Sequence, residues 1–313
     1  MVTTKRPIGT SGIEVAPIAL GGNVFDWTAD EAASFAILDA FVDAGGTMID
    51  TADVYSSWVA GHRGGESEAL IGRWLKRNPA KRDKIVIATK VGYDAGLAPD
   101  TIAPACDASL MRLGVDVIDL YYQHKDDEAV PLSDSLGAFD QLVRQGKIRA
   151  IGLSNFTPER LAAAMDAARS NDLITPAALQ PWYNLVERAR YEGSLRDVAA
   201  AEGLAVFPYF SLASGFLSGK YRSTDDSSVS TRGHRAVGYL DERGRAVLAA
   251  LEEVAAETGK AMATVALAWL KAQPTIAAPI ASATTLHQAH QLIDALSLDL
   301  GEGQIERLRA ASE

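Results

Sequence analysis

The sequence has a single cysteine, Cys106, so no disulfide bond can form within one chain. It has no apolar run near the roughly 20 residues that a membrane-spanning helix needs. Basic residues are too few for a basic face, with 30 Lys and Arg against 40 Asp and Glu and a formal net charge of -10. We therefore expect neither a nucleic acid nor a membrane as a partner. The first ten residues, MVTTKRPIGT, lack the apolar run of a signal peptide, which predicts a cytoplasmic protein.

Metal-binding spacings and interdomain linkers are missing as well. The sequence has no stretch rich in Pro, Gly or Ser that divides the chain, and no short-period repeat. Its 313 residues, 48% of them hydrophobic, therefore predict one domain over residues 1–313, a size that a single α/β barrel commonly reaches. No metal is expected, because these side chains form no ligand pattern: Cys106, His62, His234, His287 and His290.

Short apolar runs alternate with longer amphipathic segments along nearly the whole sequence, which is typical of βα units in a parallel sheet. The predicted strands are 17–20, 47–50, 85–89, 117–121, 148–152, 177–181, 204–208 and 275–279. The predicted helices are 30–44, 66–76, 103–113, 132–144, 158–168, 191–201, 261–271 and 286–296. Eight such units predict an α/β fold of the (β/α)8 TIM barrel type. Thr157 before Pro158, and Thr28 or Asp30, are expected to cap helices.

Three segments lie outside this repeat. Residues 6–15, centred on Thr10-Ser11-Gly12, predict an N-terminal β-hairpin that could plug one barrel end. Residues 222–238 are polar and without periodicity, which predicts a long loop after the seventh strand. Residues 301–312 predict a terminal helix.

Ionisable side chains stand where predicted strands end. Asp50 ends the second strand and Tyr55 follows it in IDTADVY, Lys90 ends the third in IATKVG, and His124 ends the fourth in YYQHKDD. In a barrel the reacting groups come from the carboxyl ends of the strands, so we expect these four side chains to converge. Each alone could equally be a helix cap or a solvated side chain, but the combination is harder to explain in that way.

The four side chains suit carbonyl reduction, which needs a hydride at carbon and a proton at oxygen. A tyrosine, whose free pKa is about 10, gives up its proton reluctantly at neutral pH. The ammonium of Lys90 would favour the phenolate of Tyr55, and Asp50 would keep that lysine charged and oriented. His124 would polarise the substrate oxygen as a neutral imidazole, which leaves Tyr55 as the predicted proton donor.

With these residues in view, the sequence resembles the aldo-keto reductase superfamily. The motifs IDTADVY, ATK, YYQH, GKIRAIGLSNF, LQPWYN and SLASGFLSGKY occur in the family's order over essentially the whole chain. The resemblance implies NAD(P)H-dependent reduction of aldehydes or ketones and a cofactor that lies across the barrel top without a Rossmann domain. The missing G-x-G-x-x-G fingerprint is consistent with that fold. The family's catalytic tetrad falls on Asp50, Tyr55, Lys90 and His124.

The resemblance also implies a cofactor site. Ser154, Asn155 and Gln180 would hold the nicotinamide amide, although the first two could equally cap the next helix. Tyr209 would stack beneath the nicotinamide ring. Gly22 and Asn23, at the turn after the first strand, are also expected to bind the cofactor. Further residues would contact the pyrophosphate or the adenosine end: Ser211, Leu212, Gly215, Lys220, Ser282, Thr284 and Gln288.

The expected cofactor is NADPH, because the resemblance favours it, with measurable use of NADH. Many members of the family place an arginine near the start of the final helix to bind the 2′-phosphate, and this chain has Thr284 there. A hydroxyl brings no charge, so this contact is weakened unless other groups compensate. The candidates are Ser282, Lys220, Arg222 and Arg232.

The predicted partner is a small-molecule carbonyl substrate, and the sequence does not identify it. Four aromatic residues on the loops after strands one, two and six could form an apolar wall around the carbonyl: Phe25, Trp27, Trp58 and Trp182. Core packing is the competing explanation for each. Trp58 lies in a long insertion, SSWVAGHRGGESE, that indicates no particular substrate.

Two other functions stay open at this point. A cofactor-binding regulatory protein with little turnover would keep the fold, as the potassium-channel β-subunits of the same family suggest, but the intact tetrad favours an enzyme. A phosphate-handling barrel isomerase would need a glycine-rich phosphate loop after strands seven and eight, for which SLASGFLSGK is a weak candidate. Fold alone cannot separate these functions.

Overall fold

The computed structural model describes residues 4–313. Eight parallel strands form one sheet in the order β10-β3-β4-β5-β6-β7-β8-β9. They are β3 Ala19–Gly21, β4 Met48–Asp50, β5 Val86–Val91, β6 Ile118–Gln123, β7 Ile148–Ser154, β8 Ala178–Gln180, β9 Ala205–Val206 and β10 Ile280–Ala281. All but one strand residue in this sheet are buried, because helices cover the outer face and side chains fill the inside.

The segment leading into β10 joins the two edges of this sheet. Ile276 forms a parallel bridge with Val206 of β9. The N–H of Ala277 donates to the carbonyl of Val206 at 2.8 Å. A few residues later β10 pairs with β3, where Ile280 lies opposite Ala19. One stretch of chain thus reaches both edges, and the predicted (β/α)8 barrel is confirmed.

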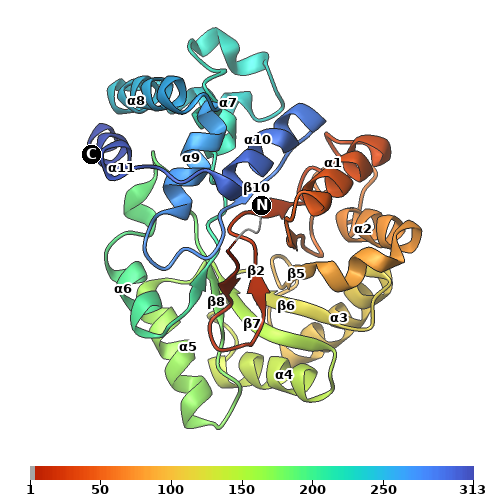
Figure 1. The fold of residues 1–313 in the computed structure, drawn as a ribbon. Helices are drawn as coiled ribbons and strands as arrows, with labels where there is room; N and C mark the ends of the chain where they lie inside the picture. Colours follow the sequence, from red (N-terminus) through yellow and green to blue (C-terminus); the bar gives the residue numbers. More distant parts are fainter. Residues whose placement is uncertain (1–3) are drawn as a thin grey trace.

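Helices surround the barrel (Figure 1). Those that follow the strands are α1 Glu31–Asp43, α2 Glu66–Arg77, α3 Pro99–Leu113, α4 Leu132–Arg144, α5 Pro158–Ser170, α6 Ser194–Ala201, α9 Met262–Lys271 and α10 Leu286–Ser297. Short 3-10 segments are η1 Pro79–Lys84, η2 Arg188–Arg190, η3 Ala213–Ser218 and η4 Thr224–Ser228. Two predicted caps are confirmed, because Asp30 accepts from the N–H of Ala33 and Thr157 from that of Arg160. Within residues 4–313, no helix is long and apolar enough to cross a membrane.

The predicted hairpin is confirmed and lies across the barrel end that faces the viewer in Figure 1. It consists of β1 Arg6–Pro7 and β2 Glu14–Val15. Ile8 and Ile13 are buried in one cluster with inward-facing strand residues such as Met48 and Ala88. The Arg6 guanidinium donates to the backbone carbonyl of Ile276 at 2.8 Å, which fixes the hairpin to the barrel.

The eighth strand was predicted at residues 275–279, and that placement is wrong. Pro279 has no N–H to donate to a ladder, and its carbonyl accepts from Ala19 at 3.0 Å. Thr275 has a φ of 69°, outside the extended region. The segment therefore makes one bridge to β9, and the regular pairing begins with Ile280.

Residues 222–238 were predicted to lack regular structure, and this is wrong in part. The segment contains η4 and the short helix α7 Gly233–Val237. Ser223 and Asp226 form a capping box that starts η4 through local hydrogen bonds rather than through apolar periodicity. The next helix, α8 Glu242–Thr258, was not predicted, because it has no strand of its own and counting βα units does not reveal it. It packs against α11 Glu302–Ala311, the predicted terminal helix. A single domain over residues 1–313 remains a prediction.

Candidate active site

A cavity of about 1150 Å³ opens at the carboxyl ends of the strands. Its wall brings together residues from all parts of the chain, which the order of strands around the barrel places side by side. The residues singled out in the sequence that line it are Asn23, Asp50, Tyr55, Trp58, His124, Ser154, Asn155, Gln180, Trp182, Tyr209, Ser211, Leu212, Gly215, Lys220, Ser282, Thr284 and Gln288.

Gly22, Phe25 and Trp27 lie outside this wall. Phe25 is fully buried in the hydrophobic core, so its assignment to the substrate pocket is corrected. Gly22 is needed for packing, since a Cβ there would be 2.9 Å from Oγ of Ser67. Trp27 packs edge-on against Trp58, which does line the cavity, with ring centroids 5.4 Å apart. Position on a loop does not reveal which way a side chain points.

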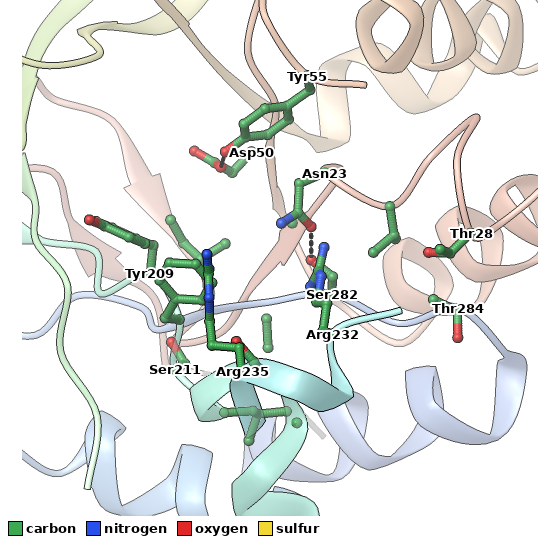
Figure 2. A pocket seen from close by; sticks show the side chains of 18 of the residues that line it. Asn23, Thr28, Asp50, Tyr55, Tyr209, Ser211, Arg232, Arg235, Ser282 and Thr284 are labelled. Carbon is green, nitrogen blue, oxygen red and sulfur yellow. Dashed lines mark hydrogen bonds between the residues drawn. The ribbon is translucent and has the colours of Figure 1, made fainter. Parts of the chain in front are cut away.

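A buried ammonium connects three of the four predicted catalytic residues, Lys90 itself, Asp50 and Tyr55. Lys90 is fully buried, and its Nζ donates to Oδ2 of Asp50 at 2.7 Å, to the hydroxyl of Tyr55 at 2.9 Å and to the carbonyl of Thr51 at 2.7 Å. Figure 2 shows the Tyr55 hydroxyl directed at Asp50, and these oxygens are 3.5 Å apart. The ring of His124 is 6.1 Å from that of Tyr55. The strand ends thus bring the four side chains together.

The pKa of Tyr55 is shifted in the direction opposite to the one predicted from the sequence. Burial, followed by the nearby Asp50 carboxylate, raises the pKa of Tyr55 well above its usual value of 10. The expected lowering by Lys90 is therefore not met, and the phenol keeps its proton at neutral pH. Burial also lowers the pKa of Lys90, while Asp50 opposes this shift. A protonated phenol beside a buried cation is arranged to donate a proton and to stabilise the anion that remains.

His124 is held as a neutral imidazole. Burial lowers its pKa well below 6.5, and the charges of Lys90 and Lys125 lower it further. Its Nδ1 is buried without a hydrogen-bond partner in the described chain. The Tyr93 ring packs on the imidazole with centroids 4.8 Å apart. A neutral, positioned imidazole can donate a hydrogen bond to a carbonyl oxygen without competing for its proton.

Gln180 makes a contact that sequence reasoning missed. Its Nε2 donates to Oδ1 of Asp50 at 2.9 Å, both side chains being buried. Each oxygen of Asp50 therefore has its own donor, since Lys90 binds Oδ2. No sequence pattern links two residues 130 positions apart. The glutamine that was expected to bind the amide is thus also hydrogen-bonded to one of the four predicted catalytic residues.

Ser154 and Asn155 do not cap the following helix, because Thr157 is the N-cap of α5. The hydroxyl of Ser154 donates to the Gln180 carbonyl at 2.9 Å. Oδ1 of Asn155 accepts from the Tyr209 hydroxyl at 2.6 Å. These bonds connect the ends of the neighbouring strands β7 and β8 and the loop after β9, so the capping alternative is wrong.

The loop after β9 approaches the cavity through an unusual backbone. Ala213, Ser214 and Gly215 all have positive φ, between 48° and 93°. Such conformations cost about 1 kcal/mol or more for non-glycine residues and persist where the surroundings enforce them.

The loops after β3 and β10 are joined at the cavity wall, where Oδ1 of Asn23 accepts from the Ser282 hydroxyl at 2.6 Å, as Figure 2 shows.

Several wall residues were not assigned to the cavity from the sequence. Tyr93 and Lys125 line the cavity and lie two residues after the ends of β5 and β6, so the rule that found Asp50 could have found them. Arg232 and Arg235 come from the α7 region and point into the cavity in Figure 2. No strand precedes them, so that rule does not reach them; Arg232 was considered only as a substitute phosphate ligand.

The family model described as the Aldo/keto reductase family matches residues 17–313. This chain belongs to that family. It is similar to an uncharacterized oxidoreductase of Bacillus subtilis, YrpG, with 33% identity over 94% of this chain and 91% of the relative. It is 30% identical to L-glyceraldehyde 3-phosphate reductase of Escherichia coli, over 93% and 87% of the two chains. A probable voltage-gated potassium channel subunit beta of rice, Oryza sativa subsp. japonica, is 28% identical over 94% and 91%. The family and its oxidoreductase relatives support an oxidoreductase.

A carboxyl group beside the tetrad gives this aldo/keto reductase a testable pH dependence of stability. Burial and the charge of Glu68 raise the pKa of Asp53 from 3.8 to about 7. The folded state thus binds this proton more tightly than the unfolded chain, so stability falls as the pH rises from about 4 to about 7 and then levels off. Asp53→Asn removes this loss, so the melting temperature of the variant minus that of wild type should increase across this window. Asp83→Asn, at an exposed carboxyl, is the control. A difference that stays constant with pH contradicts the prediction.

Proposed function

We propose that this aldo/keto reductase uses NAD(P)H to reduce aldehydes or ketones to alcohols, with Tyr55 as the proton donor. The observation that carries the proposal is the buried ammonium of Lys90, which contacts both the Tyr55 hydroxyl and the Asp50 carboxylate. A fully buried lysine is rare unless a partner compensates its charge. Here it lies beside a protonated phenol at the floor of an open cavity.

The cofactor, when bound, supplies the hydride to the carbonyl carbon. The protein's residues act on the oxygen. Tyr55 transfers its proton to that oxygen, and the Lys90 ammonium at 2.9 Å stabilises the developing phenolate. Neutral His124 donates a hydrogen bond to the same oxygen and increases the positive charge on the carbon. Gln180 and Lys90 hold Asp50 from opposite oxygens, which keeps the ammonium directed at Tyr55.

The residues of the cavity fit a dinucleotide, which the family generally uses. Ser154, Asn155 and the amide of Gln180 offer the short polar groups that a carboxamide needs. Lys220 and Arg232 rest on the rings of Tyr221 and Trp27 instead of pairing with a carboxylate in the described part of the chain. Two uncompensated cations in one wall suit the pyrophosphate.

The direct test is loss of cofactor absorbance when purified protein is mixed with NADPH and a panel of aromatic aldehydes. We expect turnover on at least some of them. Binding of NADPH without oxidation on any aldehyde would instead support a regulatory protein with little turnover. That second candidate is favoured by the similarity to the rice potassium channel subunit. The tetrad geometry favours the enzyme.

The segment 222–238 is expected to close over the cofactor. It contributes Ser230, Thr231, Arg232 and Arg235 to the cavity wall, although it also packs on η3. NADPH should therefore slow amide hydrogen exchange in this segment, measured by mass spectrometry, while α5 on the far side of the barrel serves as the internal control. Unchanged protection across 222–238 at saturating NADPH would remove this role.

The cofactor preference should respond to position 284. Both the N–H and the hydroxyl of Thr284 donate to Oε1 of Gln288, at 2.8 and 3.0 Å, and bring no charge to the cavity. Arg222 does not line the cavity and pairs with Glu252, so it is not the substitute ligand. We expect NADPH to be preferred with measurable use of NADH, and Thr284→Arg to increase the ratio of kcat/KM values about tenfold. An NADPH preference above about a thousandfold in wild type, unmoved by the arginine, would show that another group holds the phosphate.

A further inference from the structure

The charge of the cavity wall is opposite to that of the whole chain. The chain carries a formal net charge of -10. The acidic wall residues are Asp50, which is paired with Lys90 at 2.7 Å, and Asp94. The basic wall residues are Lys125, Lys220, Arg232 and Arg235. A positive cavity in an acidic protein attracts anions selectively.

A dinucleotide accounts for part of this charge. Lys220 follows η3 and rests on the ring of Tyr221, and Arg232 rests on the ring of Trp27; both are the cations proposed above for the pyrophosphate. The pyrophosphate carries two negative charges, which these two cations can match, and the 2′-phosphate of NADPH belongs to the adenosine end, where Thr284 brings no charge. Lys125 and Arg235 then remain, with the aromatic residues around the tetrad.

Lys125 lies at the end of a stack that starts at the reacting site. The imidazole of His124 packs against Tyr93 with centroids 4.8 Å apart. Nζ of Lys125 lies 5.0 Å from the centroid of the same Tyr93 ring. The Tyr93 ring therefore contacts both His124 and Lys125. A molecule whose carbonyl oxygen contacts His124 could extend along this ring and place its far end beside the Lys125 ammonium.

Arg235 occupies a similar position over other rings of the wall. Its guanidinium lies 5.2 Å from the ring centroid of Phe210, which packs on Trp182 with centroids 4.6 Å apart. Trp182 is one of the aromatic residues expected to surround the carbonyl compound. Figure 2 shows Arg235 rising from α7 into the cavity, between Tyr209 and Arg232.

Both cations keep their hydrogen-bond donors free. Two other cations on loops and helices that follow the strands are paired, Arg160 with Asp126 and Arg190 with Glu187. Lys125 and Arg235 form no ion pair within residues 4–313 and contact aromatic faces, which hold a cation in place without using its N–H donors. Such groups are ready to donate charged hydrogen bonds to an oxyanion.

We propose that the preferred substrates are aldehydes that carry an oxyanion, a carboxylate or a phosphate, bound by Lys125 and Arg235 while the aromatic residues surround the carbon frame. This inference rests on the proposed reductase function. It assigns substrate selectivity to two residues outside the catalytic cluster.

Paired aldehydes test the proposal. The probes are 4-carboxybenzaldehyde and the nearly isosteric, uncharged 4-nitrobenzaldehyde. Lys125→Met and Arg235→Met should each lower kcat/KM for the carboxylate by about tenfold relative to the nitro compound, the size of one lost charged hydrogen bond. Asp94→Asn should change this ratio in the opposite direction. Comparison with 4-formylphenyl phosphate then distinguishes a carboxylate from a phosphate as the better ligand.

The control is Arg222→Met, which removes a cation from the same segment but outside the wall. It should leave both aldehydes and KM for the cofactor unchanged. Equal losses on the charged and uncharged aldehydes in Lys125→Met and Arg235→Met would overturn the proposal. A parallel rise in cofactor KM in both variants would do so too, because it would assign these cations to the dinucleotide.

A binding measurement separates this inference from the proposed function. Quenching of tryptophan fluorescence by 4-(hydroxymethyl)benzoate and by 4-nitrobenzyl alcohol requires no turnover, and Trp58 and Trp182 line the cavity. Tighter binding of the benzoate, lost in both variants, supports the oxyanion site even if no aldehyde is reduced. Turnover of aldehydes combined with equal affinity for the two alcohols retains the reductase and overturns the oxyanion site.

Discussion

Tyr55→Phe is expected to lower kcat by about a hundredfold or more, with little change in cofactor affinity. The hydroxyl is the group that contacts the Lys90 ammonium, at 2.9 Å, and it is directed at the buried carboxylate of Asp50. Phenylalanine keeps the ring and its packing against Trp58 but removes the transferable proton. Steady-state kinetics with an aromatic aldehyde measure kcat, and fluorescence titration with NADPH measures cofactor binding.

Tyr93→Phe is the matched control for this variant. Tyr93 lies in the same cavity wall and packs on His124, yet it is 44% exposed, and the hydrogen bonds of Lys90 within residues 4–313 go to Asp50, Thr51 and Tyr55 instead. Loss of the Tyr93 hydroxyl should change kcat by no more than about a few-fold, the size expected for a contact without proton transfer. Near-normal turnover in Tyr55→Phe would remove Tyr55 from the role of proton donor.

The position of the tetrad could be predicted because strand ends are visible in the sequence. Asp50 and Lys90 each terminate or nearly terminate a short apolar run, and parallel strands place their carboxyl ends on one face of the barrel. Ordering of the strands by sequence then makes β4, β5 and β6 neighbours. Strand ends and strand order together therefore place these side chains close to one another.

What could not be predicted depends on three-dimensional packing. Phe25 and Asn23 lie on the same loop, yet Phe25 is in the core and Asn23 lines the cavity. Gln180 on β8 and Asp50 on β4 point into the barrel from opposite sides, so their side chains meet across its interior. No local sequence pattern encodes such a contact. Arg235 enters the wall from a helix of five residues with no apolar stripe.

The pKa of Tyr55 illustrates a second limit. The residue types alone predict that a neighbouring ammonium lowers it, and they do not reveal how deeply the phenol is buried. In the structure burial is the largest effect, and the Asp50 carboxylate adds to it. The sign of an electrostatic effect thus requires the balance between desolvation and charge, and this balance is a property of the folded protein.

Lys90→Met is expected to damage stability and turnover together. It leaves the Asp50 carboxylate buried without its cation, although Gln180 still donates to Oδ1. Removing one partner of a buried ion pair lowers the free energy of unfolding by about 3–5 kcal/mol. Turnover should fall about as far as in Tyr55→Phe. The double variant Tyr55→Phe/Lys90→Met should have a kcat little lower than either single variant, because Asp50, Tyr55 and Lys90 act as a unit.

A second substitution separates the two effects. In Lys90→Met/Asp50→Asn the unpaired charge is gone, so most of the lost free energy of unfolding should return, as measured by urea denaturation. Turnover should stay low, since no ammonium then stabilises the phenolate of Tyr55. If the double variant is as unstable as Lys90→Met, the buried carboxylate is not the source of the instability. If turnover returns with stability, Lys90 serves the fold and the electrostatic role assigned to it is wrong.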